Sequence, residues 1–190
     1  MRKVIAAINM TLDGFCDHTV ITPDEEIHQH YEALLDNAGV VLYGRITYQL
    51  MQFWQELLTN PSGEQSMNDF ARAIDRVPKI VFSRTLTDTG WDTARLATRS
   101  LEEEVADLRQ QPGKDILVGC RSLIIQLMNP GLIDEYQFCV HPVVAAGGLP
   151  LFENISGRTV LKLIKTKTFG GGAVTLYYEP ATETPPAANG

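Results

Sequence analysis

The sequence of 190 residues predicts an α/β fold in which a mainly parallel β-sheet is covered by helices on both faces. Short, continuous apolar runs such as Val4–Ile8 and Val40–Tyr43 are typical of strands that are buried on both faces. Segments of helical periodicity separate these runs, and this alternation indicates crossover connections between parallel strands. Gly170–Gly172 joins the last two apolar segments, which predicts an antiparallel hairpin at one edge of the sheet.

The predicted elements begin with a strand over Lys3–Asn9 and a first helix. Thr22, followed by a proline and three acids, predicts the start of this helix with Thr22 as its N-cap, and Asn37 marks its end. The elements expected after it are strand Val40–Tyr43, helix Ile46–Trp54, helix Met67–Ile74, strand Lys79–Ser83, a short strand near Trp91 and Leu96, helix Leu101–Gln110, strand Asp115–Val118, helix Ser122–Met128, strand Ile133–Val140, and strands Thr159–Phe169 and Ala173–Tyr178. They predict one domain over residues 1–179 and a disordered tail over residues 180–190.

Composition and charge exclude several classes of protein. The formal net charge of −7 argues against a nucleic-acid partner, which needs a basic face to displace counterions from phosphates. The apolar runs are too short to span a bilayer, and no signal-peptide cleavage pattern follows the N-terminus, so we expect a cytoplasmic protein without a membrane partner. Cys16, Cys120 and Cys139 are widely spaced and form no C-x-x-C pair, so neither a disulfide framework nor a metal site is predicted.

Four segments with glycine, arginine or small polar residues follow apolar strands, at the edge where open α/β sheets bind ligands. They are Asn9–Gly14, Gly44–Tyr48, Ser83–Thr85 and Gly119–Ser122. Glycine lets the backbone approach a ligand closely, and a helix start presents unpaired N–H groups to an anion. Arg45, Arg84 and Arg121 can each add a charge-assisted contact. We therefore predict a phosphate site, although each Gly-Arg pair alone also fits a tight turn beside a solvated arginine.

Several better-known motifs are absent from the sequence. Neither G-x-G-x-x-G nor G-x-x-x-x-G-K-[ST] occurs, so the common dinucleotide-binding and P-loop sites are not indicated. The zinc-deaminase signature and the G-x-S-x-G nucleophile elbow are missing as well. A nucleotide site in this chain would need another arrangement.

Five longer segments occur in a familiar order. They are VIAAINMTLDGF from Val4, VVLYGRITYQLM from Val40, KIVFSRTL from Lys79, DILVG from Asp115 and GLIDEYQFCVHPVVAAGGLPLF from Gly131. In these segments the chain, from Arg2 to about Glu179, resembles the dihydrofolate-reductase-like superfamily, in the branch similar to the reductase domain of bacterial riboflavin biosynthesis. The resemblance implies a three-layer dihydrofolate-reductase-like fold with a mostly parallel central sheet and an antiparallel C-terminal strand. It also implies NADPH as the reductant and, in many relatives, a homodimer.

The resemblance also implies roles for single residues on the cofactor side. Gly44, Arg45 and Thr47 match the loop and helix start that hold cofactor phosphate. Ser83 and Arg84 resemble the pair that recognises the adenosine 2′-phosphate, which favours NADPH over NADH. The remaining positions are Gly119, Arg121 and Ser122 in the pyrophosphate loop, Ala7 on the strand that docks the nicotinamide carboxamide, and Gly148 in a loop that admits the cofactor closely or only forms a turn.

On the substrate side, Asn9 and Thr11 match the substrate-facing loop. Asp13 is the candidate to donate or relay a proton during hydride transfer, and the alternative is that Asp13 only forms a turn with the next glycine. His141 ends a strand near the expected cleft, where a structural histidine is the favoured interpretation. His28 stands sixteen residues before Gly44, where dihydrofolate reductases proper carry a substrate-binding carboxylate, so folate is not the expected substrate. We interpret His28 itself as a solvated helix residue.

The chain departs from its relatives at Cys120, because many of them carry glycine there. A side chain at this position is expected to crowd the pyrophosphate. The sequence as a whole predicts an NADPH-dependent reductase that transfers hydride to a small heterocyclic or carbonyl- or imine-bearing substrate, similar to the riboflavin-pathway 5-amino-6-(5-phosphoribosylamino)uracil reductase. The alternative is a catalytically idle nucleotide-binding or regulatory domain on the same fold.

Overall fold

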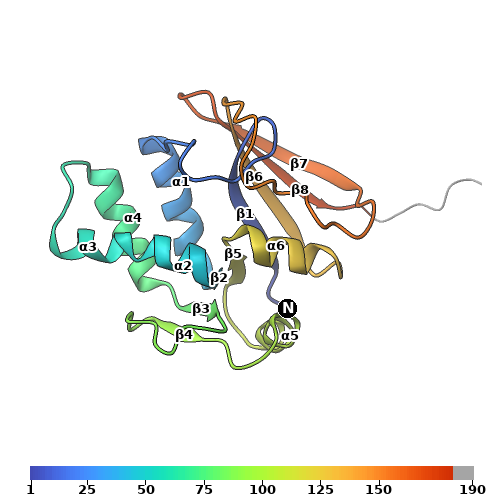
Figure 1. Cartoon of the computed structure of the whole chain (residues 1–190), viewed down its shortest axis with the longest axis horizontal. Coiled ribbons are helices and arrows are strands. Elements are labelled where there is room, and N and C mark those ends of the chain that lie inside the picture. The colour runs from blue at the N-terminus through green and yellow to red at the C-terminus, as the bar shows by residue number, and fades with distance from the viewer. Residues whose placement is uncertain (182–190) are drawn as a thin grey trace, which may run out of the picture.

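The computed structural model describes residues 1–181, and one eight-stranded sheet forms the centre of these residues (Figure 1). Its strands are β1 (Val4–Thr11), β2 (Ala38–Gly44), β3 (Lys79–Phe82), β4 (Ala94–Leu96), β5 (Asp115–Val118), β6 (Glu135–His141), β7 (Leu161–Thr168) and β8 (Val174–Pro180). Their order across the sheet is β4-β3-β2-β5-β1-β6-β8-β7. β1 to β6 pair in parallel, whereas β8 runs antiparallel to both β6 and β7. The predicted mostly parallel sheet with an antiparallel C-terminal strand is confirmed.

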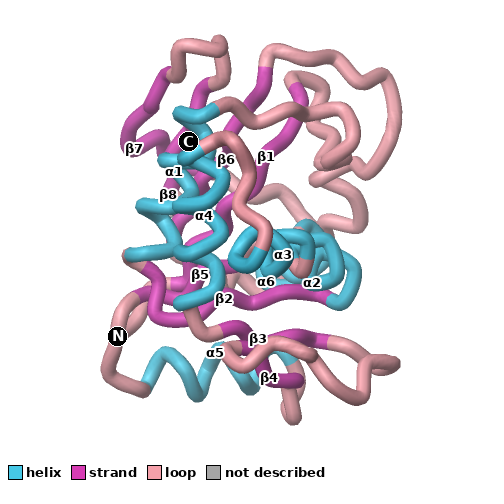
Figure 2. The backbone as a smooth tube through the Cα atoms, turned by 90° about the vertical axis from the view of Figure 1, so that its left-hand side faces the viewer, coloured by secondary structure: helices cyan, strands magenta, loops and turns pink. Residues whose placement is uncertain are grey.

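Helices cover the sheet on both faces. They are α1 (Glu25–Asp36), α2 (Arg45–Met51), α3 (Phe53–Thr59), α4 (Gln65–Arg76), α5 (Leu101–Gln110) and α6 (Arg121–Met128). Lys79 and Ile80 point to opposite faces of β3. Lys79 donates to the carbonyl of Asp75 in α4, whereas Arg95, which lies beside Ile80, forms an ion pair with Glu104 in α5. α1 lies along α4, and α6 contacts α5, so the fold has three layers (Figures 1 and 2).

The central strands are buried on both faces, as their apolar runs predict. Val41 and Leu42 are neighbours in β2 and point to opposite faces, yet neither has any exposed surface, and Ile116 and Val118 of β5 are equally buried. This burial of apolar surface is the main favourable contribution to stability. No helix in residues 1–181 is long and apolar enough to cross a membrane.

The start of the first helix differs from the sequence prediction. The N-cap is Asp24, not Thr22, because the Asp24 carboxylate accepts the backbone N–H of Ile27 at 3.0 Å. Both residues have capping chemistry, and the acid lies two positions nearer to the apolar stripe. The end near Asn37 is confirmed, since this residue is the C-cap.

The predicted single helix over Ile46–Trp54 is wrong. It is divided at Gln52 into α2 and α3. The side chain of Gln52 donates to the carbonyl of Thr89 at 3.1 Å, and the Tyr48 hydroxyl donates to the same oxygen at 2.9 Å. A loop distant in sequence therefore binds this region, and helical periodicity carries no signal of that contact. At the other end of the chain, β8 reaches Pro180, one residue beyond the predicted domain limit, and most of the predicted tail lies outside the described residues.

Candidate functional site

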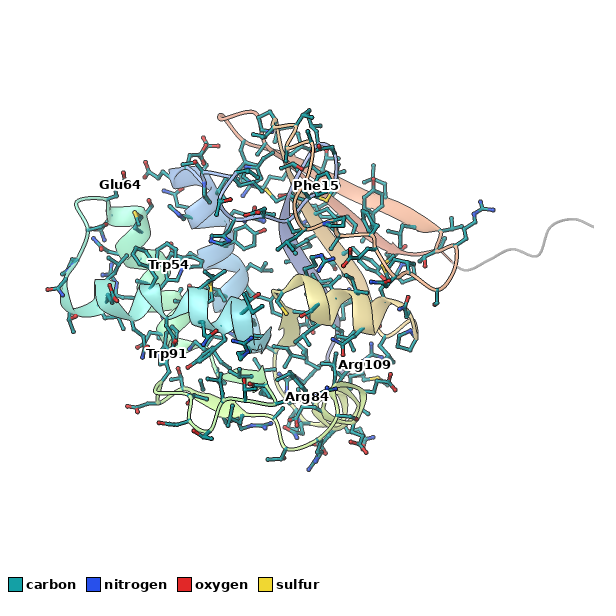
Figure 3. All side chains as sticks on the ribbon, viewed as in Figure 1. Phe15, Trp54, Glu64, Arg84, Trp91 and Arg109 are labelled. Carbon is teal, nitrogen blue, oxygen red and sulfur yellow. The ribbon has the colours of Figure 1, made fainter. Side chains whose placement is uncertain are left out.

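The sheet order brings the predicted cofactor-side segments together. β3, β2, β5 and β1 are consecutive in the sheet and parallel, so their carboxyl ends lie side by side along one edge. Arg84, which follows β3, and Phe15, which lies in the loop after β1, belong to the two ends of this edge; both side chains are labelled in Figure 3. The segments that begin at Gly44 and Gly119 lie between them, after β2 and β5. This is the edge at which open α/β sheets bind their ligands.

The two glycines at the centre of this edge are required by close packing. A Cβ on Gly44 would lie 3.1 Å from Oγ of Ser122, and a Cβ on Gly119 would lie 3.0 Å from Cε1 of Tyr43. Both distances are shorter than ordinary van der Waals contact between carbon or oxygen atoms. The absence of side chains therefore allows the turn after β2 and the turn after β5 to meet.

Two helix starts face this meeting point. α2 begins at Arg45 with Gly44 as its N-cap, and α6 begins at Arg121 with Cys120 as its N-cap. No side-chain oxygen caps either helix, and in α6 the N–H of Leu123 meets the sulfur of Cys120, so the other backbone N–H groups of the two first turns remain for a ligand or for water. Neighbouring helix starts with free N–H groups favour an anionic ligand.

Cys120 does not crowd this space, contrary to the sequence expectation. Its side chain is 2% exposed and lies beneath the turn, where the backbone N–H of Gly44 donates to Sγ at 3.2 Å. The Ser122 hydroxyl lies 3.7 Å from the same sulfur, and the Thr47 hydroxyl also contacts it. Burial raises the pKa of the Cys120 thiol, so the group is neutral. Thr47, which the resemblance assigns to cofactor phosphate, is thus turned toward the protein interior.

The three arginines of the predicted phosphate site have different surroundings. Arg84 is exposed and forms no ion pair within residues 1–181. Arg45 is exposed too, and its Nη1 donates to Oε1 of Gln49 at 3.1 Å. Arg121 instead pairs with the carboxylate of Glu153 and donates to a backbone carbonyl of the same loop. Two arginines are therefore available to an anion, whereas the third holds the loop between β6 and β7.

Ser83 shapes the turn that carries Arg84. Its Oγ accepts the backbone N–H groups of Thr85 at 3.1 Å and Leu86 at 3.0 Å, which fixes the chain as it leaves β3. Its hydroxyl proton remains available for donation. Ala7 lies in β1, 5% exposed.

Asp13 is bound in a way that favours a structural role over the predicted proton donor. Its carboxylate accepts the Thr11 hydroxyl at 2.6 Å and the backbone N–H groups of Ala145 at 3.1 Å and Ala146 at 2.8 Å. These hydrogen bonds, that of the Thr11 hydroxyl first, lower the pKa of Asp13 to about 2. The group is therefore ionised at neutral pH and has no proton to donate. It holds the β6–β7 loop, in which Ala146 has φ of 59°.

Asn9 remains a substrate-side candidate, whereas Thr11 is fully buried. Besides donating to Asp13, the Thr11 hydroxyl accepts the backbone N–H of Phe15 at 3.1 Å. Oδ1 of Asn9 lies 2.9 Å from Nε2 of His141, a buried histidine whose pKa is lowered by desolvation. In this arrangement the amide nitrogen of Asn9 is free to contact a ligand. His141 keeps the structural role favoured from the sequence.

His28 is packed among aromatic rings, so its interpretation as a solvated histidine is wrong. Its ring meets Trp54 edge-on with centroids 5.8 Å apart, and the ring of Phe70 lies 6.1 Å away. Within residues 1–181 its buried Nδ1 has no hydrogen-bond partner, and desolvation lowers the pKa of the imidazole. Its offset of sixteen residues from Gly44 was the one sequence signal for this position. The aromatic rings around His28 come from other helices, so its burial could not be predicted from the neighbouring sequence.

The remaining predicted residue, Gly148, lies on the β6–β7 loop. Its φ is 123°, which favours glycine, and a Cβ there would lie 3.5 Å from the Asp17 side chain. A strand-like bridge between Phe15 and Pro150 fixes this part of the loop beside the chain that follows β1. No cluster of side chains suited to a metal ion occurs in residues 1–181.

Comparison with known proteins supports the sequence resemblance. Residues 2–175 match the family described as the RibD C-terminal domain. Two proteins of Bacillus subtilis (strain 168) are similar over most of both chains. The uncharacterized protein YyaP is 32% identical over 93% of this chain and 94% of its own length. The uncharacterized protein YwjB is 40% identical over 93% of this chain and 97% of its own length.

Solved structures show the same fold. A putative riboflavin biosynthesis protein from Shewanella sp. PV-4 superposes with a TM-score of 0.71 at 20% identity, over 96% of this chain and all of that one. A diaminohydroxyphosphoribosylaminopyrimidine deaminase/5-amino-6-(5-phosphoribosylamino)uracil reductase from Thermotoga maritima gives a TM-score of 0.65 at 15% identity. The superposition includes 95% of this chain but only 57% of the Thermotoga maritima protein, which is longer.

Proposed function

Because the chain belongs to the RibD C-terminal domain family, we propose that it is a reductase that uses NADPH to reduce a small heterocyclic or carbonyl- or imine-bearing substrate. The observation that carries this proposal is the composition of one edge of the sheet. An exposed arginine without an ion pair among the described residues, Arg84, follows β3, and two helix starts without side-chain oxygen caps follow the neighbouring strands β2 and β5. An edge of this kind suits a ligand with several phosphates.

The residues present fit NADPH. Arg84 and the Ser83 hydroxyl would bind the adenosine 2′-phosphate, and the first turns of α2 and α6 would bind the pyrophosphate through their backbone N–H groups. The thiol of Cys120 lies beneath the turn, so the space above it is open to the ligand. When bound, the cofactor supplies the hydride, and the protein orients it and keeps water from the reacting atoms.

Neither of the two titratable candidates that the sequence placed on the substrate side, Asp13 and His141, is a ready proton donor. Asp13 is ionised and holds a loop, and His141 is buried with lowered pKa and directed toward Asn9. We therefore propose that Asn9 binds the substrate through its amide and that ordered water supplies the proton. A rate that does not titrate with a carboxylic acid between pH 4 and pH 6 would agree with this assignment.

The decisive test of the cofactor assignment is the Arg84→Ala variant. Losing a charge-assisted contact to the 2′-phosphate is expected to weaken NADPH binding by about 1.5 to 3 kcal/mol, or roughly tenfold to a hundredfold, and to leave NADH binding unchanged. Quenching of the intrinsic protein fluorescence during titration with each dinucleotide measures both affinities. Arg158→Ala, at an exposed arginine of the β6–β7 loop, is the matched control. An equal loss for NADH would refute the role of Arg84, and wild-type protein that binds neither dinucleotide would refute the reductase.

The substrate requires a second measurement. The Thermotoga maritima protein is named as a reductase of a phosphoribosylaminouracil, so a pyrimidine is the first candidate. Oxidation of NADPH in the presence of pyrimidine, pterin and quinone substrates separates an enzyme from a domain that only binds the nucleotide. Binding without turnover of any of the three classes would support the alternative of an idle or regulatory domain.

We also propose that the chain forms a homodimer through the outer strands β6, β8 and β7. Phe152 is 50% exposed and packs edge-on against Phe138 of β6, and Leu163 of β7, 49% exposed, lies opposite Tyr178 of β8. The register places these side chains on one face of the three strands. A second copy would remove this apolar surface from water. Light scattering at micromolar concentration should give twice the chain mass of 21.1 kDa.

A further inference from the structure

A pocket lies at the opposite edge of the sheet from the proposed cofactor site. It has a volume of about 440 Å³ and is formed where β1 and β5 begin and α5 ends, with Arg2, Arg109 and Gly113 in its lining. Figure 1 marks the N-terminus beside α5, and Figure 3 shows Arg109 in the same region. The eight residues of β1 separate the two edges by about 25 Å, so this pocket is not a continuation of the cofactor site.

Arg2 is buried and forms no ion pair within residues 1–181, although the nearby carboxylate of Asp115 favours its charged form. The residue is 8% exposed, its Nε donates to the carbonyl of Lys114, and no carboxylate in residues 1–181 lies within 4 Å of its guanidinium. A Cβ on Gly39 would lie 2.7 Å from Nη2 of Arg2, so a glycine makes room for this group. Desolvation lowers the pKa of Arg2, although the group stays charged. The two Nη groups of Arg2 donate to no atom of residues 1–181 and are not enclosed, so they are accessible donors in the lining of the pocket.

Arg109 has one edge in use and one edge free. Its Nη2 donates to the carbonyl of Leu132 and to Oδ2 of Asp134, both at 2.7 Å. Its Nε also lacks a partner among the described residues but is enclosed by the protein, so Nη1, which donates to no atom of residues 1–181, is the donor left for a ligand. Asp115 also lines the pocket and opposes an anion, but one of its oxygens already accepts the backbone N–H of Lys3 at 2.8 Å. The two arginines therefore offer donors to the pocket, and the second oxygen of Asp115, which accepts no hydrogen bond from residues 1–181, is the one carboxylate oxygen of the lining left unused.

We propose that this pocket binds a small molecule through an oxyanion, a carboxylate or a phosphate, that accepts hydrogen bonds from Arg2 and Arg109. Planar guanidinium groups match the oxygens of such anions, and both groups are held in place by backbone carbonyls before the ligand arrives. The volume exceeds that of a bare ion and lies within the range of small-molecule sites, so the ligand carries further atoms beside its anionic group. The site is independent of the proposed reductase activity.

The test is a titration of ¹⁵N-labelled protein with inorganic phosphate and with citrate, at constant ionic strength, followed through the backbone amides of glycine. Gly113 lines the pocket, whereas Gly44 and Gly119 report on the cofactor edge. The proposal expects a saturable shift of the Gly113 signal with at least one of the two anions. Arg84→Ala is expected to leave this shift unchanged, even where it removes phosphate binding at the cofactor edge.

Arg2→Lys and Arg109→Lys keep the positive charge but lose the planar donors, and each is expected to weaken binding at Gly113 at least tenfold. If both lysine variants bind the anion with the affinity of the wild-type protein, the anion is an adventitious ion only, and the proposal is overturned. A Gly113 signal that does not respond in the wild-type protein would overturn it as well, and this measurement does not depend on the folding of any variant. NADPH binding by folded Arg2→Lys should equal that of the wild type, which separates the two sites.

Discussion

The cofactor half of the candidate site and its substrate half are built by different means. At the ends of β2 and β5, glycines let two turns meet, and backbone N–H groups face outward beside an exposed Arg84. At the ends of β1 and β6 the polar side chains bind one another or the adjacent loop, as Asp13 does with Ala145 and Ala146. The difference teaches that a side chain at the expected end of a strand can bind a ligand only when the protein itself has not already used its hydrogen-bonding groups.

The largest expected effect tests the close packing of the cofactor half. Gly119→Val would place a branched side chain against the ring of Tyr43, and overpacking of this kind is expected to lower the free energy of unfolding by about 1 to 3 kcal/mol. Urea denaturation followed by circular dichroism measures this change. Gly147→Ala is the control, because a Cβ there meets no atom within 4 Å and should change stability little. Equal stability of both variants would show that the turns do not need their close approach.

The next effect concerns a buried histidine on the outer side of the substrate half. His30 lies among the rings of Tyr31, Phe169 and Tyr177, and desolvation, with Lys167 and Lys165, lowers its pKa to about 4. The unfolded chain binds this proton near pH 6.5, so full linkage would cost the folded state about 3 kcal/mol as the pH falls from 6.5 toward 4. Because solvent partly screens the ring, we expect a loss of about 1 to 2 kcal/mol.

The measurement for His30 is the free energy of unfolding across this pH range. His30→Gln should reduce the loss in the free energy of unfolding at low pH, since the variant has no imidazole at this position to protonate. His18→Gln, at an exposed histidine, is the control and should retain it. If both variants follow the wild-type curve, protonation of His30 does not drive the acid sensitivity.

A smaller effect is expected when the anchor of the β6–β7 loop is weakened. Asp13→Asn keeps the shape of the side chain but removes the charge that the backbone N–H groups of Ala145 and Ala146 bind. We expect these two amides to exchange with deuterium about tenfold faster, whereas amides of β5 keep their protection. Unchanged exchange together with lost NADPH oxidation would instead favour the proton-donor role.

The smallest effect is expected at Cys120. Cys120→Gly introduces the residue that the sequence resemblance leads us to expect there, but the thiol lies beneath the turn, away from the expected ligand space. The affinity for NADPH, measured by fluorescence quenching, should therefore change by less than about threefold, or roughly 0.6 kcal/mol. A tenfold gain would mean that the side chain does crowd the pyrophosphate.

Much of the fold could be predicted from the sequence because it depends on local patterns. The boundaries of α5 (Leu101–Gln110) and β5 (Asp115–Val118) are confirmed to the residue, since a serine cap precedes the first and a turn separates the two. The division of the predicted Ile46–Trp54 helix could not be foreseen, because the carbonyl that binds Gln52 belongs to Thr89. The candidate phosphate segments were found for a similar local reason, as a glycine or a small residue follows each apolar strand.

The sequence by itself determined the alternation of strands and helices, the antiparallel end of the sheet and the family, because periodicity and short motifs are properties of neighbouring residues. Only the tertiary structure decided which charged groups remain free. Arg84 and Arg121 follow strands in the same way, yet one is exposed and the other pairs with Glu153, thirty-two residues later in the chain. The same holds in part for Asp13, which accepts a hydrogen bond from the neighbouring Thr11 but also from Ala145 and Ala146, more than a hundred residues away. Hydrogen bonds between distant segments set the charge and the availability of a side chain, and no local pattern records them.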